Sequence, residues 1–242
     1  MTSIVIGASA GLGRCLARAL AARGESLVLV ARDLADLEPE AAHLRTVHGV
    51  EVTVIGADGR APQAMAEQLV AALAEVPSIR YILLPIGASR TDDDGRLPAS
   101  AAMDLTATNF LCVVAVIEAL LAKVSADGAI VGFGSIAAAR GRSGNVIYAA
   151  AKRALESYFE SLRHRLAAKV IRVQFYRLGY LDTQQAYGKK LPFPKVSPDV
   201  VAADVVANLG ADLGRRTRPA FWRLIVLAVN LVPWPLFKNL KF

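Results

Sequence analysis

The sequence predicts a single α/β domain built on a doubly wound parallel sheet with helices on both faces. Short β-branched runs alternate with longer stretches rich in alanine and leucine, and 54% of the 242 residues are hydrophobic against 20% charged. Such alternation is typical of repeated strand and helix units. The apolar content suits a sheet that is buried on both faces. A chain of this length buries a large core within one domain.

Six strands and six helices are predicted along the chain. The strands are residues 3–6, 26–30, 50–57, 81–84, 129–133 and 171–176. Five helices cover residues 12–22, 34–48, 63–74, 101–123 and 148–166. Ser197-Pro198-Asp199 predicts the start of a short sixth helix that ends near Asn208, because serine caps helices and proline suits their first turn. Right-handed crossovers place the carboxyl ends of all strands at one edge, where ligands bind.

The charge of the chain is concentrated near its carboxyl end. The net charge is +7, and residues 189–242 hold nine basic and three acidic side chains. Such asymmetry fits an anionic partner, a membrane surface or a solvated face, and we expect no nucleic-acid partner.

Cys15 and Cys112 lie in apolar helical patterns without CxxC spacing, so we expect buried free thiols and no metal site. The absence of a secretory pattern at the start predicts a cytoplasmic protein.

A glycine-rich turn follows the first predicted strand and opens the first predicted helix. Glycines let the backbone turn sharply and approach a diphosphate, whose charge is met by amide groups at the helix N-terminus. The position between strand and helix is the context that a dinucleotide-binding turn requires. We therefore predict a dinucleotide site that includes Gly7, Ser9, Gly11, Leu12 and Gly13.

Arg32 follows the second predicted strand, directly after Ala31. A protein that binds NAD needs an acidic side chain there to accept hydrogen bonds from the ribose 2′-hydroxyl, whereas a guanidinium suits a 2′-phosphate. The sequence therefore favours NADP(H) over NAD(H). The alternative is that Arg32 is only an exposed arginine at a strand end.

Ser135 ends the fifth predicted strand, and Tyr148 and Lys152 lie in the helix that follows. Residues four apart share a helix face, so the phenol and the ammonium point the same way. A cation beside a phenol stabilises its phenolate and lowers its pKa from about 10. Tyr148 is then suited to exchange a proton with a substrate oxygen that Ser135 holds by a hydrogen bond. The alternative for a bare Tyr-x-x-x-Lys pair is an exposed pair on a helix surface.

The Gly-x-x-x-Gly-x-Gly turn, Ser135 and the Tyr148–Lys152 spacing together resemble the short-chain dehydrogenase/reductase family. The resemblance covers about residues 1–183. It implies a Rossmann-type fold and an NADP(H)-dependent enzyme that moves a hydride between the nicotinamide and a carbonyl or secondary alcohol. It also implies that Asn109 kinks its helix and holds a water that relays protons to Lys152. Without the resemblance, Asn109 could equally be an ordinary helical residue.

The same resemblance implies further cofactor contacts. Asp58 matches the acid that neighbours the adenine, and Gly179 and Thr183 match the segment that meets the nicotinamide amide and phosphate. Two departures are present. Leu178 stands where the family has proline, and Leu84-Pro85-Ile86-Gly87 replaces Asn-Asn-Ala-Gly, so that only Gly87 remains of the segment that braces the sheet and lines the ribose pocket.

Beyond residue 183 the family pattern fades. We predict that residues 184–196 form a substrate loop or lid, because the segment lacks periodicity.

The tail, residues 219–242, is apolar and basic. Its apolar run is about half the roughly 20 residues that span a bilayer, and Pro233 and Pro235 break a helix. The tail therefore either lies in a membrane interface or packs on its own domain or a partner subunit. Its motifs Pro-x-x-Trp-Arg, at residues 219–223, and Pro-x-x-Leu-Phe-Lys, at residues 233–238, resemble the tail of reductases that act on polyprenyl-phosphate-linked sugars. This resemblance implies a hydrophobic or lipid-linked substrate.

Two other functions fit the same fold. A protein that senses NADP(H) without turnover would keep the dinucleotide site but would not need Ser135, Tyr148, Lys152 and Asn109. A sugar epimerase or dehydratase needs a larger substrate domain than the residues after Thr183 provide. A homodimer or homotetramer is expected, since relatives pair through the helices that would hold Asn109 and Tyr148.

Overall fold

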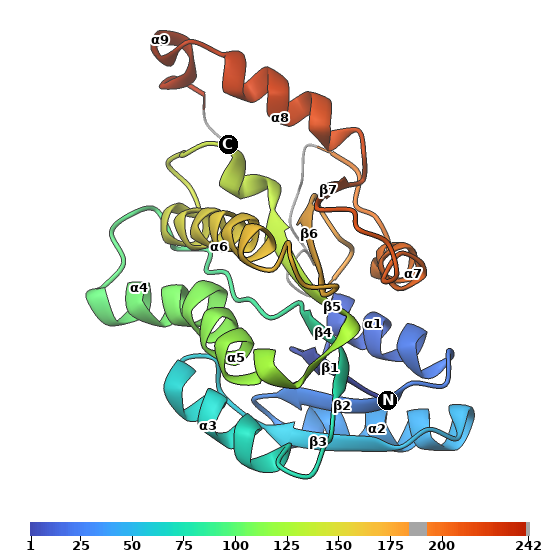
Figure 1. Ribbon diagram of the computed structural model, residues 1–242. Helices are drawn as coiled ribbons and strands as arrows, with labels where there is room; N and C mark the ends of the chain where they lie inside the picture. Colours follow the sequence, from blue (N-terminus) through green and yellow to red (C-terminus); the bar gives the residue numbers. More distant parts are fainter. Residues whose placement is uncertain (184–192, 241–242) are drawn as a thin grey trace.

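The computed structural model describes residues 1–183 and 193–240. Seven parallel strands form one sheet with the order β3-β2-β1-β4-β5-β6-β7 (Figure 1). The chain moves outward from β1 to β3, returns to the other side of β1 at β4, and then continues outward to β7. A crevice at the carboxyl ends of β1 and β4 is therefore the place where a ligand is expected in a sheet of this type.

All six predicted strands are present, and the predicted fold class is confirmed. They are β1 (Thr2–Ile6), β2 (Ser26–Ala31), β3 (Val52–Gly56), β4 (Ile79–Leu84), β5 (Val124–Ser135) and β6 (Arg172–Leu178). A seventh strand, β7 (Arg215–Arg218), was not predicted. It has no apolar pattern, because three of its four residues are arginines, and charged side chains are typical of edge strands.

Helices cover both faces of the sheet (Figure 1). One apolar core lies under α1 (Gly11–Ala21), α2 (Leu34–His48) and α7 (Pro198–Ala207). The other core lies under α3 (Pro62–Ala72), α5 (Cys112–Leu120) and α6 (Val146–Arg165). The start of α7 is as predicted, because the Ser197 hydroxyl accepts a hydrogen bond of 3.2 Å from the backbone N–H of Asp199.

The single helix predicted over residues 101–123 is interrupted. It consists of α4 (Ala99–Thr106), a π-helical turn η1 (Ala107–Leu111), α5 and a 3₁₀ turn η2 (Leu121–Lys123). Such single π turns are frequent at functional sites, and this one contains Asn109. By length and composition the stretch Ala99–Lys123 could cross a membrane, but the buried face of α5 contributes to the core of this fold.

The tail forms α8 (Trp222–Leu231) and α9 (Trp234–Phe237), which extend beyond the carboxyl edge of the sheet (Figure 1). Trp222, Val226 and Phe237 are buried on the protein side. Arg140 fastens this end of the chain, because it donates hydrogen bonds of 2.6 Å to the carbonyls of Val229 and Val232. The prediction that the tail packs on its own domain therefore holds for one face of α8.

Candidate active site and cofactor site

The glycine turn lies between the end of β1 and the start of α1. Gly7 adopts φ +95°, which is costly for any other residue. A Cβ atom on Gly13 would lie 1.9 Å from the carbonyl oxygen of Gly7, so no side chain fits there. Ala10 precedes the helix and offers no side-chain cap. The first N–H groups of α1 therefore remain available to an anion.

Two other segments meet the glycine turn. A Cβ atom on Gly7 would lie 3.0 Å from the Cα of Ile86, which follows β4, and one on Gly11 would lie 3.1 Å from Cγ2 of Thr183. The predicted contacts at Gly7, Gly11 and Thr183 thus lie side by side at the carboxyl edge of the sheet. Ser9 and Leu12 lie in the same turn, and Leu12 is buried beneath it.

Arg32 and Asp58 lie at the carboxyl ends of neighbouring strands, β2 and β3. Arg32 is exposed. Asp58 forms an ion pair of 2.6 Å with Arg60, which together with the more distant charge of Arg32 holds the pKa of the Asp58 carboxyl below its usual value. The Arg32 guanidinium therefore lies near the carboxylate of Asp58 but is exposed, so that it can bind a phosphate group from the solvent side.

Lys152 lies at the bottom of the site and is buried. Its Nζ donates hydrogen bonds of 3.2 Å to the carbonyls of Ile86 and Phe133, at the ends of β4 and β5. Burial lowers the pKa of Lys152 to about 8. An ammonium has three N–H donors; two are used by these carbonyls, and the third has no partner within residues 1–183 and 193–240. The carbonyl of Ile86 belongs to the backbone, so the change from the family's Asn-Asn-Ala sequence does not remove this contact.

Asn109 braces the segment after β4. Its Nδ2 donates hydrogen bonds to the carbonyls of Ala88, at 2.8 Å, and Leu105, at 2.9 Å, while its Oδ1 accepts one of 3.2 Å from the N–H of Ala88. A Cβ atom on Gly87 would lie 2.9 Å from Oδ1 of Asn109 and 3.1 Å from Nζ of Lys152. Gly87, Asn109 and Lys152 therefore meet at one point.

Ser135 and Tyr148 face each other across the end of β5. The Ser135 hydroxyl accepts a hydrogen bond of 3.1 Å from the N–H of Ala137 and lies close enough to Tyr148 to affect the pKa of its phenol. Although Tyr148 is partly exposed, the surrounding protein raises the pKa of its phenol, and the proximity of Ser135 only partly opposes this. The expected lowering of the Tyr148 pKa by Lys152 is thus wrong: burial raises this pKa, and the Lys152 ammonium is directed to two backbone carbonyls.

One residue that holds the helix of Tyr148 and Lys152 in place was not predicted, because no pattern in the sequence marks it. Asp93 is 2% exposed, and its carboxylate accepts hydrogen bonds from the backbone N–H groups of Ile147, at 3.0 Å, and Tyr148, at 2.9 Å. Its carbonyl accepts a third from Val146. Asp93 caps α6 from a distant loop, and Arg14, which donates to the carbonyl of Ser9, supports the glycine turn in a similar way.

Aromatic side chains border the site at the end of β6. The ring of Trp222 lies 5.2 Å from that of Tyr180 and 4.8 Å from that of Phe193, measured between centroids. A Cβ atom on Gly179 would lie 2.0 Å from Nε1 of Trp222. Most of the predicted substrate loop, residues 184–192, lies outside the described residues; within its remainder, Val196 pairs with Leu181 in a short parallel bridge.

Known proteins resemble this chain in sequence and in fold. The family model described as short chain dehydrogenase matches residues 2–190. An uncharacterized oxidoreductase of Myxococcus xanthus is 31% identical over 247 residues, which cover 98% of this chain and 94% of that protein. An uncharacterized oxidoreductase of Streptomyces coelicolor is 30% identical, with 98% and 94% covered.

Two solved structures have the same fold. A short-chain dehydrogenase from Sphingobium yanoikuyae in complex with NADPH superimposes with a TM-score of 0.82 at 25% identity, covering 100% of this chain and 96% of that one. A bulky-bulky ketone specific alcohol dehydrogenase from Comamonas testosteroni gives 0.81 at 23% identity, with 99% and 94% covered. The match of the family model over most of the chain, together with relatives at 30% identity or more over nearly its whole length, shows that the protein belongs to the short-chain dehydrogenase family.

Proposed function

We propose that the protein is an NADP(H)-dependent oxidoreductase that interconverts a carbonyl group and a secondary alcohol. The observation that carries the proposal is the convergence of Ser135, Tyr148 and Lys152 beside the glycine turn. The relative from Sphingobium yanoikuyae is described with NADPH, and Arg32 supports the same cofactor here because a guanidinium pairs with a 2′-phosphate.

Bound NADPH would supply the hydride that reaches the carbonyl carbon. Ser135 would donate a hydrogen bond to the substrate oxygen and fix its position. Tyr148 would then protonate that oxygen as negative charge develops on it, or remove the hydroxyl proton in the reverse direction. The raised pKa of Tyr148 keeps the phenol protonated before reduction, which is the form that a proton donor needs.

Lys152 would bind the cofactor from the buried side of the site. Its free N–H is directed by the two carbonyl contacts, and we assign it to a hydroxyl of the cofactor ribose. A cofactor that approaches this ammonium would bring Lys152 into a network with Tyr148, which favours the phenolate. Asn109 would maintain the network, because it fixes Gly87 and Ala88 against Lys152; the proton-relaying water that the family resemblance implies remains a prediction.

A hydrophobic substrate fits the surroundings of the site. The Trp222, Tyr180 and Phe193 cluster offers an apolar wall at the strand ends, and pockets for hydrophobic ligands are typically lined by such side chains. A lipid-linked ketone belongs to the same class. The homodimer or homotetramer expected from the family also remains a prediction.

The test is oxidation of NADPH and NADH, followed by absorbance, against ketones, aldehydes and lipid-linked sugars. Tyr148→Phe is expected to lower kcat at least about 100-fold, the range for loss of a general acid, while NADPH binding, followed by fluorescence, stays unchanged. Tyr158→Phe is the matched control, because this tyrosine of α6 donates its hydroxyl hydrogen bond to Glu118 of α5, away from the proposed catalytic residues. NADPH binding without turnover of any substrate would instead indicate a sensor, and turnover by Tyr148→Phe at the wild-type rate would contradict the mechanism.

A further inference from the structure

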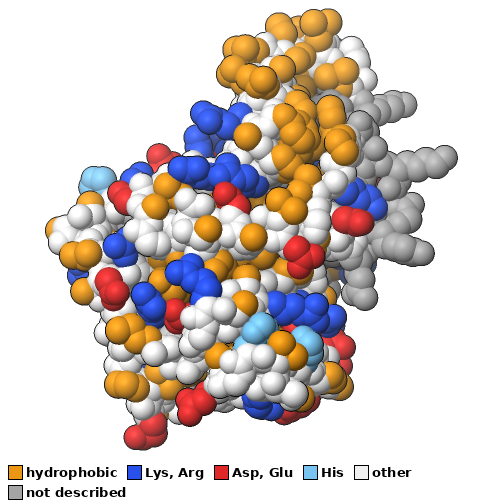
Figure 2. Space-filling view, turned by 90° about the vertical axis from the view of Figure 1, so that its right-hand side faces the viewer, with side chains coloured by type: hydrophobic (Ala, Val, Ile, Leu, Met, Phe, Trp, Pro, Cys, Tyr) orange, Lys and Arg blue, Asp and Glu red, His pale blue; other side chains and the backbone are white. Residues whose placement is uncertain are grey.

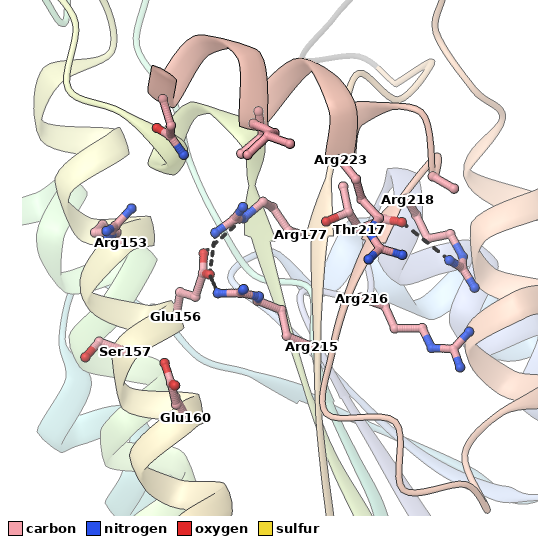
Figure 3. Close-up of a pocket in the computed structure, with 14 residues that line it drawn as sticks. Arg153, Glu156, Ser157, Glu160, Arg177, Arg215, Arg216, Thr217, Arg218 and Arg223 are labelled. Carbon is pink, nitrogen blue, oxygen red and sulfur yellow. Dashed lines mark hydrogen bonds and ion pairs between the residues drawn. The ribbon is translucent and has the colours of Figure 1, made fainter. Parts of the chain in front are cut away.

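A groove of about 810 Å³ lies along the edge strand β7, between α6 and α8 (Figure 3). Six arginines line it, and we call it the arginine groove. They come from four elements of the fold: Arg153, Arg177, Arg215, Arg216, Arg218 and Arg223. In Figure 3 the side chains of Arg177 and Arg215 lie on one side of β7, and those of Arg216, Arg218 and Arg223 lie on the other. The groove therefore wraps around the edge of the sheet.

Carboxylates neutralise only part of this charge. Glu156 is buried and forms ion pairs with Arg177, at 2.5 Å, and Arg215, at 2.7 Å. Glu160 is the other acidic side chain in the lining, and Arg218 pairs with Asp204 at 2.7 Å. Six arginines thus face two glutamates in the lining, which leaves a marked positive excess.

Three of the lining arginines form no ion pair in the described residues: Arg153, which donates to the carbonyls of Ala138 and Ala139, and Arg216 and Arg223. Within residues 1–183 and 193–240, neither Arg216 nor Arg223 has a hydrogen-bond or ion-pair partner. Arg223 is exposed and Arg216 is partly exposed. Guanidinium groups in such a setting are well suited to phosphate, because their donors match its oxygens in pairs.

An apolar surface adjoins the arginine groove. Leu224 and Leu231 are each 72% exposed, and Trp234 is 65% exposed. Leu227 belongs to both surfaces, because it lines the groove and is itself 56% exposed. Figure 2 shows the hydrophobic side chains of this end gathered into a cap with lysine and arginine side chains below it. An exposed apolar patch of this kind marks an interaction site.

We propose that α8, α9 and the arginine groove form one surface that docks on a membrane containing anionic phospholipids. The exposed leucines and Trp234 enter the interfacial layer, and Arg216 and Arg223 pair with lipid phosphates. A helix of ten residues is too short to span a bilayer. It is suited to lie in the interface plane, where tryptophan and basic side chains are favoured.

The charge argues against a second copy of the chain as the occupant. Two copies that met edge to edge through β7 would set arginines against arginines, and like charges opposite each other destabilise such pairing. An anionic lipid surface supplies the opposite charge and the apolar layer together. The proposal is independent of the proposed catalytic function, since it concerns residues outside the catalytic set.

The first experiment is flotation of the full chain with vesicles of phosphatidylcholine alone or mixed with phosphatidylglycerol. The protein is expected to float with the mixture, much less with phosphatidylcholine alone, and less as salt shortens the Debye length from about 10 Å at 0.1 M to about 3 Å at 1 M. Arg216→Gln combined with Arg223→Gln should weaken partitioning roughly tenfold to thirtyfold.

The matched control is Arg165→Gln combined with Lys169→Gln, which removes two charges beyond the groove, at and after the carboxyl end of α6. It is expected to keep nearly wild-type partitioning. Equal binding to both vesicle types, or equal loss in both double variants, would overturn the proposal. The unfolding temperature of each variant is measured as well, and a value equal to that of the wild type shows that the variant is folded.

The second experiment follows tryptophan emission. The chain has two tryptophans, and only Trp234 is exposed, since Trp222 is 3% exposed. Anionic vesicles should shift the emission to shorter wavelength, and Trp234→Phe should abolish the shift. Leu224→Gln combined with Leu231→Gln should reduce both the shift and flotation. Light scattering that shows a dimer in the wild type and a monomer in this leucine variant would overturn the proposal, because a second copy would then cover the surface.

Discussion

The carboxylate of Asp93 accepts a hydrogen bond of 2.9 Å from the backbone N–H of Tyr148, which is 55 positions further along the chain. This contact joins the loop after β4 to the first turn of the helix that holds the proposed proton donor. Asn109 fixes the beginning of the same loop through Ala88. The loop is therefore held at its beginning and near its middle by elements of the site, and the position of Tyr148 depends on it.

Replacing Asp93 should destabilise the protein and slow its reaction. Asp93→Ala leaves two backbone N–H groups at the start of α6 without their acceptor, and loss of a cap costs about 1 kcal/mol, with up to about 3 kcal/mol for a buried group left unpaired. We expect the free energy of unfolding in urea to fall by roughly 2 kcal/mol and kcat to fall with it. Asp93→Asn retains an acceptor and should lose less. Asp92→Asn, which affects only an exposed pair with Arg90, should match the wild type.

A methyl group at position 13 should abolish cofactor binding. The Cβ of Gly13→Ala would lie 1.9 Å from the Gly7 carbonyl oxygen, so the turn must open or α1 must move. We expect loss of the fluorescence change on NADPH addition and a lower unfolding temperature. Gly141→Ala is the control, since the space around Gly141 is open. Normal NADPH binding by Gly13→Ala would show that the turn is not the cofactor site.

The stability of the protein should depend on pH through Lys152. Burial lowers its pKa from 10.5 to about 8, so between these values the unfolded chain binds a proton that the folded chain has lost. The cost of burying the ammonium is fully present below pH 8 and is relieved as pH rises. Relative to Lys152→Met, the wild type should gain about 3 kcal/mol of unfolding free energy between pH 8 and 10.5. Denaturation at both limits measures this, and parallel pH profiles would refute the assignment.

Arg32 should determine the preference between the two nicotinamide cofactors. Arg32→Ala removes the guanidinium that we assign to the 2′-phosphate, and a charge-assisted pair contributes about 1.5 to 3 kcal/mol. The KM for NADPH is expected to rise roughly 10-fold to 100-fold while that for NADH changes little. Arg96→Ala, an exposed arginine paired with Asp94, is the control. An equal rise for both cofactors would place Arg32 away from the phosphate.

The fold was predictable because nearly every element of the sheet and its covering helices carries its own periodic signal. The runs of β1 to β6 are apolar and β-branched, and α2 begins and ends at the predicted residues. The exceptions lack that signal. β7 is an edge strand with three arginines, and the π turn around Asn109 differs from the adjoining α-helix only in its hydrogen bonds.

The side chains of the candidate site could be predicted, but the hydrogen bonds that hold them could not. Spacing placed Ser135, Tyr148 and Lys152 together because a strand end and one helix turn determine their neighbourhood. The partners of Lys152 are backbone carbonyls, which any residue provides, and Asp93 lies in a loop without a periodic pattern. The direction of the Tyr148 pKa shift likewise depends on burial and on where the ammonium points, and neither is visible in a residue spacing.

The contact of Trp222 with Gly179 links the evolution of two distant positions. The indole nitrogen occupies the space that any side chain at position 179 would need. A relative that carries a larger residue in place of Gly179 must therefore have a smaller one in place of Trp222, or a displaced α8. We expect the two positions to covary among related sequences, with glycine retained wherever the tryptophan is.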